Sequence, residues 1–254
     1  MDLEVPAVTL AALLLATARA AGFVMLAPPF NTRTIPGPVK GALALALSVA
    51  LVDRVAVDLP EPTAGFLVVT AVTEVAIGAA LGFVVQLFFT AVQFAGELVD
   101  VTGGFTLQPA YDPLSMTMNS VMGKLHTLLA TTLLFTSNGH LLLVRGFATS
   151  YEGLPVTGGF PVDSIGAVVL TAFSMMFLAA LQIAGPMVAV LLLSDVALAL
   201  LSRAAPTLNI FAIGFPVKIM LTLTLLGLTF PLLPTALDAL LEQATRAVIS
   251  IRSG

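Results

Sequence analysis

Residues 74–100 read EVAIGAALGFVVQLFFTAVQFAGELVD, an apolar run in which a polar or small residue recurs about every fourth position. Because an α-helix completes a turn in about 3.6 residues, this spacing places those residues on one side of a helix. The other positions are mostly apolar. We call this set the polar stripe, and its members are Glu74, Gly78, Gly82, Gln86, Gln93, Glu97 and Asp100.

The polar stripe has three readings from its residues alone. A carboxylate in a membrane helix is costly when it faces lipid, so the stripe should face protein or a water-filled lumen. Gly78 and Gly82 form a GxxxG step, which allows another helix to approach closely. Packing between helices, the wall of a lumen, and a proton or ion path all fit this pattern.

The composition indicates an all-α integral membrane protein. Hydrophobic residues make up 58% of the 254 residues, charged residues only 9%, and the mean hydropathy is +1.07. A soluble domain carries about 25% charged residues, so lipid or protein must cover much of this surface. The net charge of −4 and the lack of a Lys/Arg block argue against nucleic acid as a partner. The acidic start lacks the basic region of a cleavable signal peptide, so we expect the first apolar run to be retained.

The apolar runs predict helices, and about 20 residues are needed to span a bilayer. The basic residues do not fall on one side, so the topology stays open. The expected helices are 7–28, interrupted by Arg19; a short one at 41–52; 64–101; 124–147, with residues 137–140 in its middle; 165–202, kinked at Gly185-Pro186; and 208–241, with Pro216, Pro231 and Pro234 as breakers, before a polar tail.

A sequence repeat links two parts of the chain. Pro28-x-x-Asn31 precedes Pro38-Val39-Lys40, and the same offsets recur in Pro206-x-x-Asn209 and Pro216-Val217-Lys218. Coincidence in a Leu-rich chain is one reading. The other is two related units, each a loop that leads into a helix with Pro in its first turn; such repeats occur in transporters and also fit stacked hairpins.

The segment 103–119 is the strongest loop candidate, because Gly, Pro and Asp interrupt the apolar pattern there. Glycine gives backbone freedom, and methionine adapts to irregular gaps. An apolar loop between membrane helices belongs inside an assembly, as a plug of a lumen or as a re-entrant packing loop. The candidate plug or gate residues are Gly103, Gly104, Phe105, Leu107, Tyr111, Met116, Met118 and Met122.

Other isolated polar residues lie at or near helix depth, where buried ion pairing or a subunit contact is expected. Which acid meets which base cannot be read from the sequence. These residues are Lys124, Asp195, Arg203, Asn209 and Lys218.

Catalysis is not expected. The chain has no cysteine, and His126 and His140 stand far apart without a Glu-x-x-His context. Phosphate-binding and nucleophile motifs are missing from the sequence as well. We therefore predict no catalytic residue, no metal site and no cofactor.

Several motifs together resemble the FliR family across nearly the whole chain. They are Glu74-x3-Gly78-x3-Gly82-Phe83, residues 95–103 (AGELVDVTG), Asp112-Pro113, Asn138-Gly139-His140, and residues 202–219, SRAAPTLNIFAIGFPVKI. The family typically has Gln where this chain has Thr207. The Gly214-Phe215-Pro216 form looks more like the flagellar branch than the injectisome relatives.

The resemblance implies one membrane domain over residues 1–254, FliP-like over about 1–160 and FliQ-like over about 161–254. It implies a subunit of the flagellar type III export gate, in the bacterial cytoplasmic (inner) membrane at the flagellar basal body. FliP- and FliQ-type subunits would complete a stack of helical hairpins around a pore for unfolded flagellar substrates, with FlhB- and FlhA-type subunits nearby. The loop at 103–119 would then be the plug.

The alternative from another class is a repeat-containing secondary transporter of small solutes. It would work alone or as a homodimer and bind its solute at Asp195 or Glu74.

Overall fold

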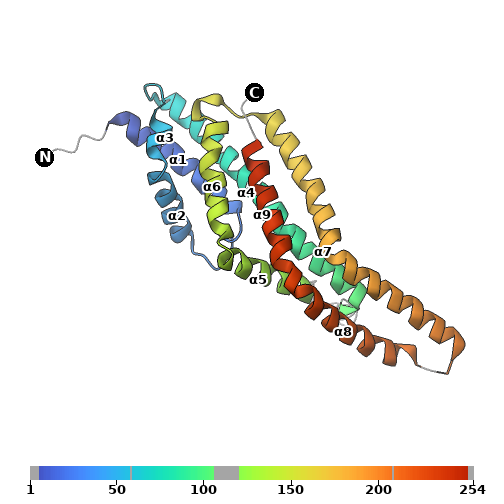
Figure 1. The fold of residues 1–254 in the computed structure, drawn as a ribbon. Helices are drawn as coiled ribbons and strands as arrows, with labels where there is room; N and C mark the ends of the chain where they lie inside the picture. Colours follow the sequence, from blue (N-terminus) through green and yellow to red (C-terminus); the bar gives the residue numbers. More distant parts are fainter. Residues whose placement is uncertain (1–5, 58, 106–119, 208, 251–254) are drawn as a thin grey trace, which may run out of the picture. The chain divides into compact units, whose positions relative to one another are not determined.

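The computed structural model describes residues 6–57, 59–105, 120–207 and 209–250, and all regular structure in these ranges is helical. This confirms the all-α class (Figure 1). The elements are α1 (Ala7–Leu26), α2 (Gly37–Val49), α3 (Val52–Ala56), α4 (Ala64–Gly103), α5 (Val121–Thr136), α6 (Gly139–Gly153), the 3₁₀ turn η2 (Val156–Gly158), α7 (Val162–Ala204), α8 (Ile210–Thr229), the 3₁₀ turn η3 (Phe230–Leu232) and α9 (Leu233–Ser250).

Four helical runs of the described residues are long and apolar enough to cross a membrane: Ala7–Leu26, Ala64–Gly103, Val162–Ala204 and Ala212–Ala247. The broken pair α5 and α6 makes a fifth candidate. At 1.5 Å per residue, the 40 residues of α4 extend about 60 Å and the 43 of α7 about 65 Å. The hydrocarbon core of a bilayer is about 30 Å thick, so neither helix is one simple crossing.

The prediction of one helix over residues 124–147 is wrong in one respect. The structure has two helices there, α5 and α6, with a break between them. The helix α5 ends at Thr136, and Asn138 has a positive φ of 58° before α6 begins at Gly139. Asn tolerates this left-handed conformation better than most residues, and the change of backbone direction ends one helix and starts the next.

The predicted breakers Pro216, Pro231 and Pro234 do not all interrupt a helix. Pro186 lies inside the continuous α7, and Pro216 lies inside α8, so the prediction that Pro216 breaks the helix is wrong. A proline removes one helical hydrogen bond, a loss that a 20-residue apolar helix tolerates. The other two predicted breakers do mark a change of element: Pro231 lies in η3 and Pro234 at the start of α9.

The two copies of the sequence repeat have different structures. Pro38 lies in the first turn of α2, as predicted. In the second copy Asn209 is the N-cap of α8 and its side chain accepts a hydrogen bond from the Ala212 N–H at 3.2 Å, while Pro216 comes well after the first turn. The repeat therefore does not mark two equivalent Pro-capped helices.

The chain divides into two compact units. Unit 1 comprises Met1–Phe88, Asn138–Ser174 and Leu240–Gly254. Its core forms around α1, where Leu15, Ala16 and Phe23 are buried. The ring of Phe23 lies 4.9 Å from that of Phe147 on α6, so large apolar side chains join α1 to α6.

Unit 2 comprises Phe89–Ser137 and Met175–Ala239. Its core is made of Ala, Val and Met side chains from the end of α4, from α5 and from α7: Ala95, Val99, Met122, Ala180, Ala184 and Met187. Within this unit α7 and α8 run antiparallel, because Asp195 pairs with Lys218 and Met187 accepts a hydrogen bond from Thr229.

Candidate functional site: the polar stripe of α4 and its C-terminal end

The polar stripe begins with a buried ion pair in unit 1. Glu74 is fully buried on α4, and Arg19, from the middle of α1, is fully buried opposite it. Arg19 Nε donates to Glu74 Oε2 at 2.5 Å, and Arg19 Nη2 donates to Glu74 Oε1 at 2.8 Å. This two-point geometry is the strong form of an Arg–carboxylate contact, and the Glu74 charge is balanced inside the chain.

The glycines of the polar stripe let α1 and α4 touch. A Cβ added at Gly78 would overlap the Arg19 carbonyl oxygen, and one added at Gly82 would lie 2.7 Å from the Phe23 carbonyl oxygen. On the other helix, a Cβ at Gly22 would lie 2.8 Å from the Ala79 nitrogen. Glycine is therefore required on both sides of this crossing, as the GxxxG step predicts.

The last stripe member in unit 1 faces the turn after α1. Asn31 Nδ2 donates to Gln86 Oε1 at 2.6 Å and to the Leu26 carbonyl oxygen at 3.0 Å. All four stripe members of unit 1 thus contact α1 or the turn that follows it, as a packing face does.

In unit 2 two members of the polar stripe, Gln93 and Glu97, are accessible to solvent. Gln93 is exposed and donates from Nε2 to Glu97 Oε1 at 2.9 Å, while Glu97 is half-buried. Asp100 is buried: its carboxylate accepts a hydrogen bond from the Ser120 hydroxyl and another, at 3.2 Å, from the Met122 N–H. A carboxylate is favourable at a helix N-terminus, and here it holds the start of α5.

The candidate plug residues fall partly in the described structure. Gly103 ends α4, and Gly104 follows with a φ of 85°, a left-handed conformation that suits glycine. Phe105 packs against the core of unit 2. Met122 belongs to α5 and is buried in that core, and its role as a plug or gate residue stays a prediction. Leu107, Tyr111, Met116 and Met118 lie outside the described residues.

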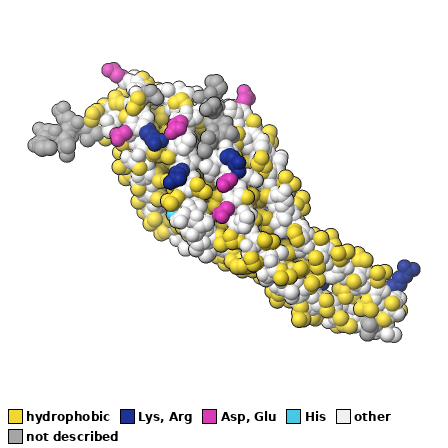
Figure 2. All heavy atoms as spheres, viewed as in Figure 1, with side chains coloured by type: hydrophobic (Ala, Val, Ile, Leu, Met, Phe, Trp, Pro, Cys, Tyr) yellow, Lys and Arg dark blue, Asp and Glu magenta, His cyan; other side chains and the backbone are white. Residues whose placement is uncertain are grey.

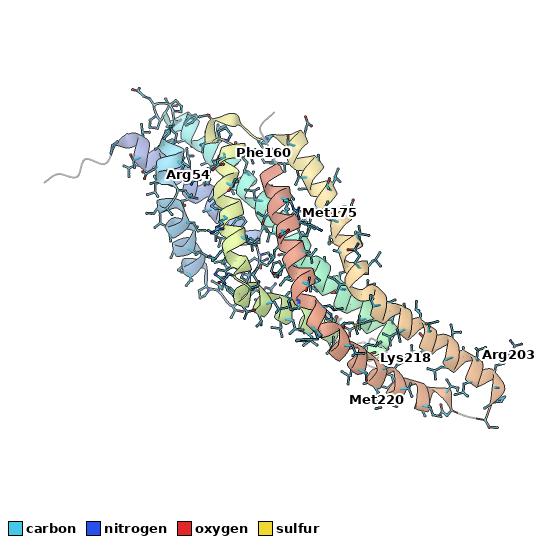
Figure 3. The ribbon with its side chains drawn as sticks, viewed as in Figure 1. Arg54, Phe160, Met175, Arg203, Lys218 and Met220 are labelled. Carbon is cyan, nitrogen blue, oxygen red and sulfur yellow. The ribbon has the colours of Figure 1, made fainter. Side chains whose placement is uncertain are left out.

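The isolated charges separate into one pair and two exposed side chains. Lys218 forms an ion pair with Asp195, and its Nζ also donates to the Thr102 carbonyl oxygen at 3.3 Å, near the end of α4. Arg203 is exposed in the last turn of α7, at the turn towards α8 (Figure 3). Lys124 is exposed on α5 and Asn209 at the start of α8. A subunit contact for these three remains a prediction.

Sequence reasoning missed the partners that complete these contacts. Arg19 carried a signal, since a single Arg within a 20-residue apolar helix must be paired or reach water. Asn31 and Ser120 carried no such signal. Asn31 binds Gln86, 55 positions away, and Ser120 binds Asp100, 20 positions away.

Comparison with known proteins agrees with the motifs. The profile of "Bacterial export proteins, family 1" matches residues 10–244. The flagellar biosynthetic protein FliR of Escherichia coli K12 is 33% identical over 236 residues, which cover 92% of this chain and 90% of that protein. FliR of Bacillus subtilis 168 is 28% identical over 218 residues, 85% of this chain and 84% of that protein.

A relative from the injectisome side is the Yop proteins translocation protein T of Yersinia pestis, 33% identical over 147 residues, 57% of this chain and 56% of its own length. The family that the sequence motifs resemble is thereby confirmed. This chain belongs to family 1 of the bacterial export proteins, the family of the flagellar FliR proteins.

Proposed function

We propose that this chain is the FliR-type subunit of the flagellar type III protein-export gate, in the bacterial cytoplasmic (inner) membrane. The observation that supports this most strongly is the family match over residues 10–244, which contain every candidate site residue. The apolar helices fit a multi-pass protein. The relatives are named for flagellar biosynthesis and for Yop protein translocation.

The proposed partners are FliP- and FliQ-type subunits, with FlhB- and FlhA-type subunits close by. Much of unit 2 is apolar at its surface, for example Leu193, Met220 and Leu228, about 70% exposed, and hydrophobic side chains dominate α7 and α8 in Figure 2. The Asp195 side chain is 43% exposed in this apolar surface. A half-exposed carboxylate is costly against lipid, which favours a protein partner there.

The FliP-like portion, residues 1–160, and the FliQ-like portion, residues 161–254, are part of the same proposal. The two compact units divide the chain differently, since each unit takes residues from both portions. The proposal therefore rests on the family resemblance and not on this division.

The proposed role is passive, without catalysis or a cofactor. The assembled gate would pass unfolded flagellar substrates through a shared pore, closed by the segment after Gly103, with energy from the proton motive force and a separate ATPase. Two described contacts support the proposal that the residues on either side of that segment are held in place. They are Asp100 with Ser120, and Lys218 with the Thr102 carbonyl oxygen. Both hold residues next to its ends.

The solute transporter is not supported. Its two candidate binding carboxylates, Glu74 and Asp195, each have a cation partner inside the chain, and the relatives reported above are flagellar and translocation proteins.

Co-purification tests the proposal. The tagged chain is expressed with and without FliP- and FliQ-type subunits of the same bacterium. We expect one complex that contains all three and poor yield of the chain alone. A stable monomer whose thermal unfolding is shifted by small solutes, and which does not bind the other two chains, would contradict the proposal.

A further inference from the structure

Arg19 does more within unit 1 than balance Glu74. Its Nη2 also donates to the Leu154 carbonyl oxygen at 2.8 Å, and its Nη1 donates to the Ser150 hydroxyl at 3.4 Å. The Tyr151 ring centroid lies 4.0 Å from its Cζ, a distance suited to a cation–π contact. We call Arg19, Glu74, Ser150, Tyr151 and Leu154 the Arg19 cluster; it joins α1, α4 and α6.

The contact with Leu154 is a helix cap. Leu154 is the C-cap residue of α6, and the last carbonyls of a helix have no partner within the helix. A cation is favourable at that end, and a bound donor is needed because Leu154 is only 1% exposed. Arg19 therefore holds the point where the chain leaves α6 for η2 and α7.

The crossing of α1 and α4 lies at the level of Arg19. The built Cβ of Gly78 overlaps the Arg19 carbonyl oxygen itself, so the closest approach of the two backbones falls at the level of the ion pair. Glu74 takes two of the four hydrogen bonds of the guanidinium. Without Glu74 the cation would be buried with its charge uncompensated, which is strongly unfavourable.

We propose that Arg19 is the positioning residue of unit 1: α1 enters the membrane paired with α4 through Glu74, and the paired guanidinium then fixes the end of α6. The inference concerns this chain alone and does not depend on the export function. The helix α1 is, on this view, not an autonomous membrane span, although its length and apolar composition suit one.

Charge removal tests the pairing step. Arg19→Met and Glu74→Met each leave one buried charge alone, and we expect at least a tenfold fall in the amount of membrane-inserted chain. The double variant leaves no charge within the Arg19 cluster and should recover at least half of the wild-type amount. The pairing step is refuted if Arg19→Met inserts like the wild type, or if the double variant inserts no better than the singles.

A cysteine probe tests the positioning step. The chain has no cysteine, and Val156, two residues after Leu154, is buried in η2. In detergent, Val156→Cys should resist a water-soluble maleimide in the wild-type background. It should react several-fold faster in the double variant, which has no donor for the Leu154 carbonyl oxygen at position 19. The same is expected in Arg19→Lys, because Lys keeps the charge but lacks the forked donors.

The control is Leu134→Cys, fully buried on α5 in unit 2, which should stay protected in every background. Protection of Val156→Cys in both altered backgrounds would overturn the positioning role. This holds even if the single charge variants show the expected loss of membrane insertion. Export activity enters neither readout, so failure here leaves the proposed function standing, and failure of the co-purification leaves Arg19 unaffected.

Discussion

The carboxylate of Asp100, near the end of α4, accepts a hydrogen bond from the hydroxyl of Ser120, the N-cap residue of α5. Ser120 Oγ in turn accepts from the Gly123 N–H at 2.8 Å. The two side chains hold the end of one helix against the start of the next, across 20 residues of chain. The residues that join them are those proposed to plug the gate.

Asp100→Ala should loosen this contact. The Met122 N–H and the Ser120 hydroxyl lose a buried charged acceptor, at a cost of about 1–3 kcal/mol in the free energy of unfolding. Because the chain has no Trp and only two Tyr, the helical circular dichroism signal in detergent is the better measure. Glu242→Ala, in an exposed ion pair on α9, is the control and should unfold as the wild type does. Equal midpoints for all three proteins would show that the contact does not stabilise the chain.

Gly78→Ala should separate α1 from α4. The new methyl group overlaps backbone atoms that cannot rotate away, so we expect a loss of about 1–3 kcal/mol in unfolding free energy. Gly65→Ala lies on the same helix with nothing within 4 Å and should be neutral or stabilising by up to about 1 kcal/mol. Thermal unfolding of the two variants measures the difference, and a Gly78→Ala protein as stable as Gly65→Ala would refute the close crossing.

Glu97→Leu should leave the fold of the chain intact, in contrast to Glu74→Leu. Glu97 is half-buried and its hydrogen-bond partner is the exposed Gln93, whereas Glu74 is fully buried against Arg19. The membrane-inserted amount of each variant, by quantitative blotting, should fall only for Glu74→Leu. If both fall equally, Glu97 also serves the internal fold. If Glu97→Leu inserts, lost co-purification with partners indicates packing, and retained co-purification with weaker export indicates a lumen wall.

Asn138→Val should destabilise the break between α5 and α6. A β-branched residue at a φ of 58° is strained, and we expect a cost of about 1–2 kcal/mol. Asn138→Gly should match the wild type or exceed it, because glycine adopts positive φ freely. Ser137→Val, one residue earlier at a φ of −85°, is the control. Thermal unfolding orders the variants, and an unchanged midpoint for Asn138→Val would argue for a continuous helix.

Local patterns predicted α4 well, since the expected helix 64–101 differs from Ala64–Gly103 only at its end. Helical spacing also placed Glu74, Gly78 and Gly82 on one face, which is the face that meets α1. Periodicity is a property of neighbouring residues, so it is visible in the sequence.

Partners far apart in the chain were beyond such reasoning. Glu74 could pair with any of several basic residues, and only the packing of α1 selects Arg19. Asp195 and Lys218 were both recognised as isolated charges, yet their pairing depends on the antiparallel course of α7 and α8. The break at Asn138 was missed because the apolar pattern continues on both sides of it, although Asn-Gly is a known signal at helix ends.

The most direct test of the central claim is the conductance of the assembled gate after removal of residues 104–114. Purified complexes with and without the deletion are compared in planar lipid bilayers, after co-purification has shown that both contain the same subunits. The account predicts that the wild-type complex is closed and that the deletion makes it leak ions or small molecules. Unchanged conductance in an intact deleted complex would contradict the claim that this segment closes the pore.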